Sequence, residues 1–594
     1  MKTEILKFKL LKLKDIINKQ GLKGAFYFLS GKIKKRIHQK KFYNQLIHGG
    51  KIDSKLNQVI LTEIQKLGYK PLISIIMPVY NVEEIWLRKA IDSVISQIYG
   101  QWELCIANDA STHDYIRPIL DEYAALDKRI KVVHRESCGN ISAASNSALS
   151  MATGEFIGLL DHDDEITSDA LFEVVKLLNQ TPDADLIYSD EDKIDERNKV
   201  FNPWFKPDWS PEYLLTHMYV CHFSVYRKNI LNAVGGFRSQ FDGAQDYDLC
   251  LRVTEKTKSI YHIPKILYHW RTISTSTALN PTAKLYAYEA GRKAVEEHLK
   301  RVFGRGTASF TDYYGVYKVN HEPAGTPLVS IIIPSAGKET SIKNENTCLL
   351  LNCLRSIREL STYKNVEIII VDGADIDESV IHECNSLGVS WVHIAKKFNF
   401  SERINAGVKV SKGEYLIFLN DDTEIITPNW IEEMLGFAEQ PEIGAVGAKL
   451  ITETRQVQHA GIIINDAAPG HIYYGIPDLG QGYFNALAAY KNYIAVTGAC
   501  LMVSRKKFDD VGMMDESFPV NFNDVDLCLK LHQMGYRNVY NSHVVLYHFE
   551  SVTRSKGYEA AELIRFRNKW MHYRAAIIDP YHHQVLFMFP ALIQ

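Results

Sequence analysis

The sequence lacks the long apolar runs, paired cysteines and charge excess that mark several common protein classes. No stretch of about 18 or more consecutive apolar residues occurs, so no segment is predicted to span a membrane. The nine cysteines are odd in number and form no CxxC pair, which favours reduced thiols in the cytoplasm over a disulfide framework or a zinc site. The net charge of −2 predicts no nucleic-acid partner. The N-terminus also lacks the apolar block of a signal peptide.

What is present is a chain of 594 residues, of which 46% are hydrophobic, enough for several globular domains. Its first part stands apart. Between Met1 and Lys41 there are thirteen Lys or Arg residues and two acidic residues, with apolar residues interleaved. Such a basic amphipathic helical segment can lie on an anionic membrane surface, or it can pack on the next domain with its lysines in water. We expect the protein at the inner face of the plasma membrane.

The most informative stretch is GEFIGLLDHDDE at residues 154–165. Its apolar residues Phe156 to Leu160 predict a strand buried on both faces, which then runs into a cluster of acids. Clustered carboxylates at the end of a buried strand favour a bound divalent cation. Taken alone, the stretch also fits a solvated acidic turn.

The stretch occurs twice, since residues 413–424 read GEYLIFLNDDTE. Three further blocks repeat in the same order: PLISIIMP (71–78) and PLVSIIIP (327–334), QDYDLCLR (245–252) and NDVDLCLK (523–530), YHW (268–270) and YHF (547–549). These repeats predict a tandem duplication of one large domain, far longer than a solenoid repeat.

Strands alternate with helices in the first copy, which predicts an α/β, mostly parallel, Rossmann-like sheet in each domain. The predicted division is a basic helical segment (1–70), a first domain (71–305), a joint (306–326), a second domain (327–557), and a C-terminal helix with an apolar tail (558–594).

The order of these motifs resembles family 2 glycosyltransferases, which have the GT-A fold. The resemblance rests on PVYN after the first strand, an acid ending the second, DxD ending a central strand, a later Asp-x-Asp-Leu block and a Tyr-His pair. Because both halves match, the chain is similar to tandem bacterial enzymes that build O-antigen, capsule or rhamnan chains.

The resemblance implies a divalent metal, Mn²⁺ or Mg²⁺, in each half. Transfer from a nucleotide sugar expels a diphosphate, and a cation neutralises the charge that grows on it. The implied ligands are Asp161, Asp163 and His269 in the first half, and Asp422 and His548 in the second. In its aromatic run, His269 also fits a packed core histidine, but the second copy favours the ligand role.

The acceptor hydroxyl must lose a proton as it attacks, and one carboxylate suffices as the general base of an inverting displacement. By their place in the motif, Asp246 and Asp524 are the implied bases. Asp248 and Asp526 are the alternatives, and one acid of each pair can instead cap a helix.

Donor binding falls to the loops after the first strands. The implied residues are Pro78, Val79, Tyr80, Asp109 and Asp161 in the first half, and Pro334, Asp372 and Asn420 in the second. The second half departs from the pattern at Ala336, which replaces Tyr80, and at Asn420, which replaces Asp161.

These observations predict a bifunctional, metal-dependent, inverting glycosyltransferase. It would transfer sugars from UDP- or dTDP-linked donors to a growing glycan acceptor, a polyprenyl-linked bacterial surface polysaccharide. One alternative is a single activity with a second domain that only binds glycan. Two others are a nucleotidyltransferase, disfavoured because PVYN is not a Gly-rich basic loop, and a lectin-like scaffold without catalysis.

Overall fold

The computed structural model describes residues 53–273, 285–342, 345–549 and 560–592. The basic segment predicted between residues 1 and 41 lies outside the described residues. The described chain forms two compact units. Unit 1 comprises the residues up to Phe205 together with Val220–Ala287, and unit 2 comprises Lys206–Tyr219 together with the residues from Tyr288 onward.

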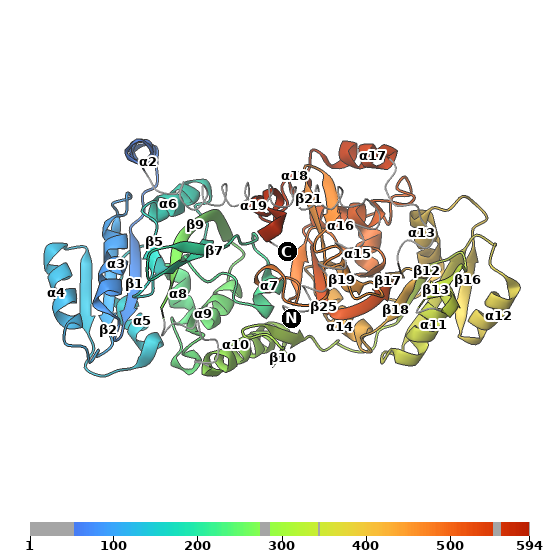
Figure 1. The fold of residues 1–594 in the computed structure, drawn as a ribbon, viewed down its shortest axis with the longest axis horizontal. Coiled ribbons are helices and arrows are strands. Elements are labelled where there is room, and N and C mark those ends of the chain that lie inside the picture. Colours follow the sequence, from blue (N-terminus) through green and yellow to red (C-terminus); the bar gives the residue numbers. More distant parts are fainter. Residues whose placement is uncertain (1–52, 274–284, 343–344, 550–559, 593–594) are drawn as a thin grey trace, which may run out of the picture. The chain divides into compact units, whose positions relative to one another are not determined.

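Unit 1 is an alternation of strands and helices (Figure 1). Its strands are β1 (Ile73–Val79), β2 (Trp102–Asn108), β3 (Ile130–His134), β4 (Phe156–Leu159), β5 (Glu165–Ile166), β6 (Leu186–Asp195), β7 (Val200–Trp204), β8 (Ser224–Arg227) and β9 (Ile260–Thr272). Its helices are α2 (Ser54–Lys66), α3 (Glu84–Ile95), α4 (Ile116–Leu126), α5 (Asn140–Met151), α6 (Ala170–Gln180), α8 (Lys228–Val234), η1 (Ser239–Phe241) and α9 (Gln245–Thr254).

The strands of unit 1 form one sheet in the order β3-β2-β1-β4-β8-β6-β9-β5, with β7 beside β6. The first four of these strands are parallel, and β8 then runs antiparallel to β4 and β6. Strand β1 has the composition of a strand covered on both faces, because Ile73, Ile75, Ile76 and Met77 are all buried.

Unit 2 repeats this plan. Its strands are β10 (Thr307–Phe310), β11 (Tyr317–Asn320), β12 (Val329–Pro334), β13 (Glu339–Ile342), β14 (Glu345–Cys348), β15 (Val366–Asp372), β16 (Val389–His393), β17 (Tyr415–Leu419), β18 (Thr423–Ile425), β19 (Ile443–Ile451), β20 (Val457–His459), β21 (Ile462–Asn465), β22 (Ala468–His471), β23 (Lys491–Tyr493), β24 (Cys500–Ser504) and β25 (Arg537–His548). Its helices are α7 (Pro211–Thr216), α11 (Leu349–Leu360), α12 (Glu378–Ser386), α13 (Phe400–Val410), α14 (Trp430–Ala438), η3 (Tyr483–Asn485), α15 (Arg505–Asp510), α16 (Asn523–Gln533), α17 (Ala560–Trp570), α18 (Arg574–Ile577), α19 (Gln584–Met588) and η4 (Pro590–Leu592), and α10 (Leu285–Phe303) lies mostly in this unit.

The large sheet of unit 2 has the order β16-β15-β12-β17-β24-β19-β25-β18, which matches the order in unit 1 strand for strand. Strands β16, β15, β12 and β17 are parallel, and β24 runs antiparallel to its two neighbours. The predicted fold class, an α/β protein with mostly parallel sheets, is confirmed.

The two units differ from the predicted domain boundaries in two places. Residues 206–219 and 288–305 lie within the predicted first domain but belong to unit 2. The first of these segments contains α7, and its buried Glu212 accepts hydrogen bonds from Arg537 at 2.7 and 3.1 Å and from Asn492 at 2.5 Å. A buried carboxylate needs such partners, and unit 2 supplies them.

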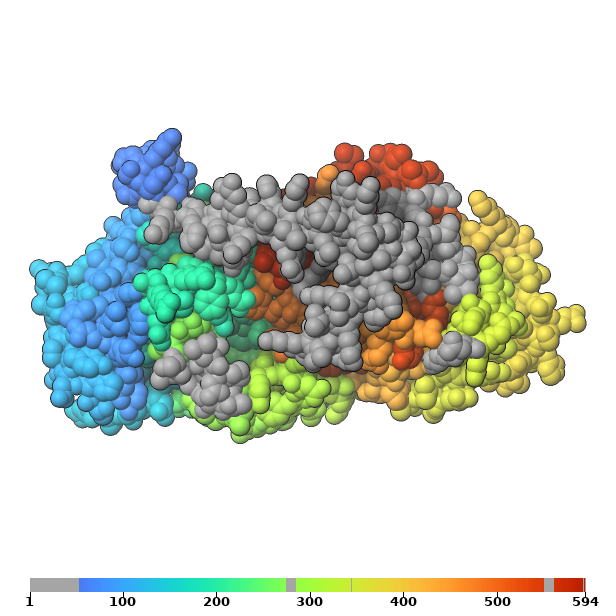
Figure 2. Space-filling model, viewed as in Figure 1, coloured from blue at the N-terminus to red at the C-terminus, as the bar shows by residue number. Residues whose placement is uncertain are grey.

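Helices α2 and α17 pack against the cores of unit 1 and unit 2, respectively. Figure 2 shows α2, in blue, projecting from unit 1, where its Glu63 pairs with Lys176 of α6 at 3.6 Å. In unit 2, Phe566 and Trp570 of α17 are buried. Within the described part of the chain, every helix is too short or too polar to cross a lipid bilayer.

Candidate active sites

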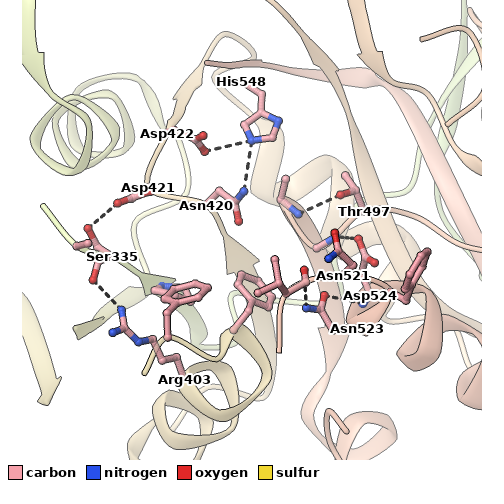
Figure 3. Close-up of a pocket in the computed structure, with 18 of the residues that line it drawn as sticks. Ser335, Arg403, Asn420, Asp421, Asp422, Thr497, Asn521, Asn523, Asp524 and His548 are labelled. Atoms are coloured by element: carbon pink, nitrogen blue, oxygen red, sulfur yellow. Dashed lines mark hydrogen bonds and ion pairs between the residues drawn. The ribbon is translucent and has the colours of Figure 1, made fainter. Parts of the chain in front are cut away.

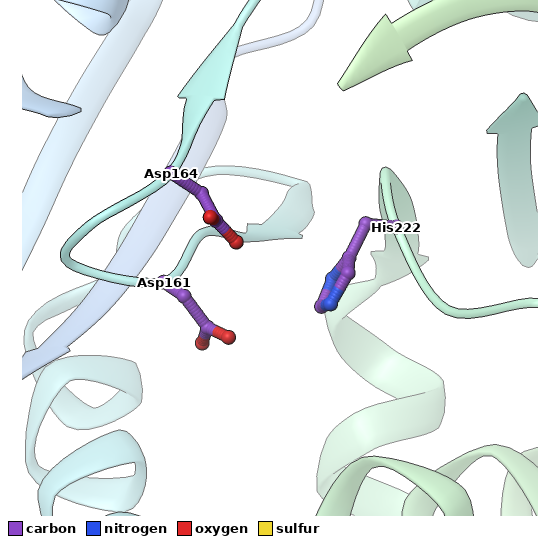
Figure 4. A group of neighbouring side chains, drawn as sticks. All are labelled: Asp161, Asp164 and His222. Atoms are coloured by element: carbon purple, nitrogen blue, oxygen red, sulfur yellow. The ribbon is translucent and has the colours of Figure 1, made fainter. Parts of the chain in front are cut away.

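The acidic stretch of unit 1 leaves β4 at the edge where the parallel strands end, the usual ligand-binding edge of an open α/β sheet. Three side chains meet there: Asp161 and Asp164 from the loop after β4, and His222 from the loop before β8. One ligand atom of each lies within 4.8 Å of the others. Figure 4 shows the ring of His222 facing the two carboxylates.

The carboxylates of this group are crowded, and Asp164 is buried whereas Asp161 is half-buried. Burial, and next the charges of Asp163 and Asp161, raise the pKa of Asp164 well above its ordinary value. Burial also raises the pKa of Asp163. Tyr268 Oη donates to Asp164 at 2.5 Å and the backbone N–H of Arg271 donates at 2.6 Å. Two oxygen ligands and one imidazole suit Mn²⁺ or another divalent cation, so the donor set fits the implied metal.

The structure does not bring the predicted ligand His269 into this group. Its Nδ1 lies 2.6 Å from Oδ1 of Asp192 on β6. The strand register gives the reason. Glu165 lies opposite His269, whereas its counterpart Glu424 lies opposite Tyr547. The Tyr-His pairs of the two halves are therefore offset by one residue, and a one-residue offset turns a strand side chain to the other face of the sheet.

By the same register, His548 of unit 2 corresponds in position to Trp270 of unit 1. The imidazole of unit 1 instead comes from His222, whose ring centroid lies 6.1 Å from that of Trp270. Asp163 also lies outside the three-residue group, and its backbone carbonyl accepts from Nε of Arg271 at 2.8 Å. The structure thus differs from the prediction at two of the three ligands in unit 1.

The candidate base of unit 1 lies at the start of α9. Asp246 is half-buried, desolvation by its surroundings raises its pKa, and it interacts electrostatically with His222 and Asp161. The alternative, Asp248, is fully buried and forms ion pairs with Arg238 and, at 2.7 Å, with Arg252. These pairs explain Asp248 as a structural residue, and the base role of Asp246 stays a prediction.

The predicted donor residues of unit 1 follow β1 and β2. Pro78 and Val79 end β1, the carbonyl of Pro78 lies 3.1 Å from Nδ1 of His162, and Tyr80 is 44% exposed. Asp109 follows β2, and its backbone N–H donates to the carbonyl of Val79 at 2.9 Å. An exposed aromatic ring at this edge can stack on a nucleotide base.

The carboxylate of Asp109 is engaged within the protein. It accepts from Nε of Arg135 at 2.7 Å and from the backbone N–H of Gly139 at 3.0 Å. A base N–H bound by Asp109 would therefore join or displace these donors.

In unit 2 the predicted residues surround one cavity of about 1300 Å³ (Figure 3). Its lining includes Pro334, Asn420, Asp422, Asp524 and His548, all predicted from the sequence. Asp372 is not in the lining, but its neighbour Gly373 is. The carboxylate of Asp372 lies 2.5 Å from Nδ1 of His393.

His548 is held between a glutamine and a carboxylate. Its Nδ1 lies 3.1 Å from Oε1 of Gln458, an oxygen that can only accept, so Nδ1 carries a proton. Its Nε2 lies 3.1 Å from Oδ1 of Asp422 and 3.3 Å from Nδ2 of Asn420. An imidazole oriented through its other nitrogen beside a carboxylate is the arrangement of a metal ligand, so the residues of unit 2 also fit a divalent cation.

The candidate base of unit 2, Asp524, lies at the start of α16. The backbone N–H of Gly498 donates to its Oδ2 at 2.9 Å, and that of Val525 donates to its Oδ1 at 2.8 Å. The alternative, Asp526, is fully buried and is held by Nε1 of Trp570 at 2.8 Å and by Nζ of Lys569 at 2.7 Å. As in unit 1, the second acid of the motif is bound within the protein.

Sequence reasoning missed three residues of these sites: His222, Asp164 and Gln458. Asp164 lies within the acidic stretch, but the sequence does not show that this residue is buried. His222 and Gln458 belong to no repeated motif, and only the folded chain brings them to the sites.

Two α/β units, each with carboxylates and an imidazole at the carboxyl edge of a parallel sheet, define a GT-A-like protein. The family model "Glycosyl transferase family 2" matches residues 74–235 and 330–512, and the chain belongs to this family.

Individual proteins are similar to this chain over much of its length. The chain is 40% identical over 545 residues to the uncharacterized protein y4gI of Sinorhizobium fredii, an alignment that covers 89% of this chain and 58% of that protein. It is 35% identical over 521 residues to the O-antigen biosynthesis protein RfbC of Myxococcus xanthus, which covers 86% of this chain and 40% of that protein. The chain therefore spans about half the length of these relatives. Among solved structures, S. aureus TarS 1-349 in complex with UDP-GlcNAc is 20% identical with a TM-score of 0.32, covering 39% of this chain and 66% of that one.

Proposed function

We propose that each unit transfers a sugar, with inversion, from a UDP- or dTDP-linked donor to a growing bacterial surface polysaccharide. The observation that carries this proposal is the cavity of unit 2 described above. It brings a metal-side carboxylate, an oriented histidine, a candidate base and the end of the first strand to one place. The relative named for O-antigen biosynthesis supports a polysaccharide product.

In the proposed reaction the acceptor hydroxyl attacks the anomeric carbon from the face opposite the leaving diphosphate. The new bond joins the acceptor oxygen to that carbon, the bond to the diphosphate oxygen breaks, and the proton passes to Asp524 or Asp246. The two backbone N–H groups on Asp524 fix the orientation of its carboxylate. An oriented base typically contributes about 10²- to 10⁴-fold in rate.

A divalent metal, Mn²⁺ or Mg²⁺, would be held by Asp161, Asp164 and His222 in unit 1, and by Asp422 and His548 in unit 2. When bound, it would neutralise charge on the departing diphosphate. We therefore expect chelation to abolish transfer and either metal to restore it. Full activity in excess chelator would contradict this part of the proposal.

The two units differ where the donor is held, which supports two donors or two linkages. Ala336 stands where unit 1 has Tyr80, and Asn420 stands where it has Asp161. If Asn420 weakens the metal site of unit 2, the same two differences favour the alternative in which only unit 1 is active.

We also propose that the acceptor is polyprenyl-linked and that the basic residues of the first part of the chain hold the enzyme at the inner face of the plasma membrane. Their support is the charge pattern of the sequence. A variant starting near Lys51 should stay active on glycan acceptors without lipid but fail to sediment with anionic vesicles. If the full chain ignores such vesicles at low salt, this part of the proposal is wrong.

The decisive experiment uses Asp246→Asn and Asp524→Asn in the full chain, with Asp509→Asn on the exposed surface of α15 as the matched control. On a defined acceptor, each of the first two variants should stall after a different sugar. Mixing them should restore chain growth if intermediates dissociate. If Asp524→Asn leaves every product unchanged, unit 2 is not a catalyst and the single-activity alternative holds.

A further inference from the structure

The cavity of unit 2 is larger than one substrate requires. Pockets that enclose a single small ligand typically measure about 300–1,000 Å³, and this cavity is about 1300 Å³. It therefore has room for a donor and for part of a second molecule.

Two parts of the cavity lining differ in charge. The part formed by α13 and the loops after β12, β15 and β16 carries one acid, Asp375, and four cationic side chains that suit the diphosphate of a donor: Lys338, Lys396, Lys397 and Arg403. Another part of the lining consists of Gln458, Ile462, Pro469, Gly470, His471 and Tyr474, none of which carries a fixed charge. We call residues 457–474 the neutral wall.

The neutral wall belongs to unit 2 alone. Strand β20 pairs antiparallel with β19, as β7 pairs with β6 in unit 1. After β20 the chain forms the β21–β22 hairpin, whereas after β7 it departs into the segment Lys206–Tyr219 of unit 2. Residues 196–223, all of which are described, hold no hairpin that corresponds to β21–β22.

The wall is held rigidly from behind by the C-terminal part of the chain. The backbone N–H of Ile464 donates to Oδ2 of Asp579 at 2.9 Å, and the backbone N–H of Ala467 donates to the carbonyl of Ala576 at 2.9 Å. A surface that is already ordered loses little conformational entropy when it binds and positions a ligand.

The histidine pair of the wall has a defined proton pattern. Nε2 of the buried His459 accepts from the backbone N–H groups of Gly461 at 3.3 Å and Thr497 at 3.4 Å, so its proton is on Nδ1. That Nδ1 lies 2.9 Å from Nδ1 of His471, which must therefore accept. In its neutral form His471 then carries its own proton on Nε2, as a hydrogen-bond donor.

Beside His471 lies an aromatic ring at the cavity surface. The ring centroids of His471 and Tyr474 are 6.5 Å apart, and Tyr474 is 58% exposed although it lines the cavity. The negative face of an aromatic ring attracts the C–H groups of a sugar ring, and an imidazole N–H suits a sugar hydroxyl.

We propose that the neutral wall, through His471 and Tyr474, binds the terminal pyranose of the acceptor glycan and so determines which acceptor unit 2 extends. This rests on the proposed function of unit 2 as a transferase. The two residues bind and orient the acceptor, and they take no proton in the reaction.

The test uses the full chain with Tyr474→Ala, Tyr474→Phe and His471→Ala, and with Tyr314→Ala as a control of equal exposure, 56%, away from the cavity. The background is Asp246→Asn, so that unit 2 alone transfers. Donors are UDP-glucose, UDP-N-acetylglucosamine and dTDP-rhamnose, and acceptors are methyl glycosides of rhamnose, galactose and N-acetylglucosamine. Release of nucleoside diphosphate without acceptor measures how well unit 2 binds and activates the donor. The KM for the methyl glycoside measures how well the neutral wall binds the acceptor.

We expect Tyr474→Ala and His471→Ala to raise the acceptor KM about tenfold or more, with donor hydrolysis and donor KM nearly unchanged. Tyr474→Phe and Tyr314→Ala should behave as the parent chain does. The proposal would be overturned if the acceptor KM were unchanged in both alanine variants. It would also be overturned if the parent chain hydrolysed a donor but bound none of the glycosides. A chain that hydrolyses and transfers no nucleotide sugar would instead contradict the proposed function itself.

Discussion

Oε1 of Gln458 accepts a hydrogen bond of 3.1 Å from Nδ1 of His548, and this contact turns the other ring nitrogen toward Asp422. Gln458→Ala should therefore weaken Mn²⁺ binding by unit 2 about 10- to 100-fold, because outer-shell partners of metal-bound histidines have effects of this size. Calorimetric titration with Mn²⁺ in a chain carrying Asp161→Ala would measure it. Gln533→Ala on the exposed end of α16 is the control, and equal affinities in the two variants would contradict the prediction.

The imidazole of unit 1 should be that of His222 rather than His269. In a chain carrying Asp422→Ala, His222→Ala should weaken Mn²⁺ binding by about tenfold or more, since it removes one of three converging groups. His269→Ala should leave the affinity nearly unchanged, because this ring bonds to Asp192. Electron paramagnetic resonance of Mn²⁺ would distinguish the two, and a larger loss in His269→Ala would restore the original sequence-based assignment.

The ion pair between Glu212 and Arg537 should be important for the stability of unit 2. Arg537→Met leaves the Glu212 carboxylate buried without its cation and should lower the free energy of unfolding by about 3–5 kcal/mol. Adding Glu212→Met should recover much of this loss. Urea unfolding would measure it, with Lys506→Ala in the exposed pair with Asp510 as a control that changes little.

A related consequence concerns fragments. A chain beginning at residue 288 lacks the segment 206–219, which packs in unit 2, and should unfold at lower urea than the same unit in the full chain. Equal midpoints would show that the segment is dispensable.

Stability should fall as pH rises through the range in which Asp579 ionises. Burial raises the pKa of Asp579 to about 7 from its ordinary value of 3.8. The folded state therefore binds this proton more tightly than the unfolded state, so the contribution favours folding at low pH and is lost between about pH 4 and pH 7. The loss approaches about 4 kcal/mol. Unfolding midpoints at pH 5 and pH 8 should differ less in Asp579→Asn than in the parent chain, and an equal difference in both would contradict the assignment.

The sequence by itself determined the fold class and indicated which residues of unit 2 lie around its cavity. Apolar strands that end in acids occur twice in the same order, and hydrophobic burial forces such strands into the middle of a sheet. The acids that follow them must then lie at one edge. Asp422, Asp524 and His548, all named from the sequence, line one cavity, and their roles in the reaction stay predictions.

Only the tertiary structure shows that His222 rather than His269 lies beside Asp161 and Asp164, how His548 is oriented, and that residues 206–219 pack within unit 2. The Tyr-His pairs look equivalent in sequence, but strand pairing sets them one residue apart, and side chains alternate between faces with each residue. His222, Gln458 and Glu212 act through partners far away in the chain, and local pattern carries no information about such contacts.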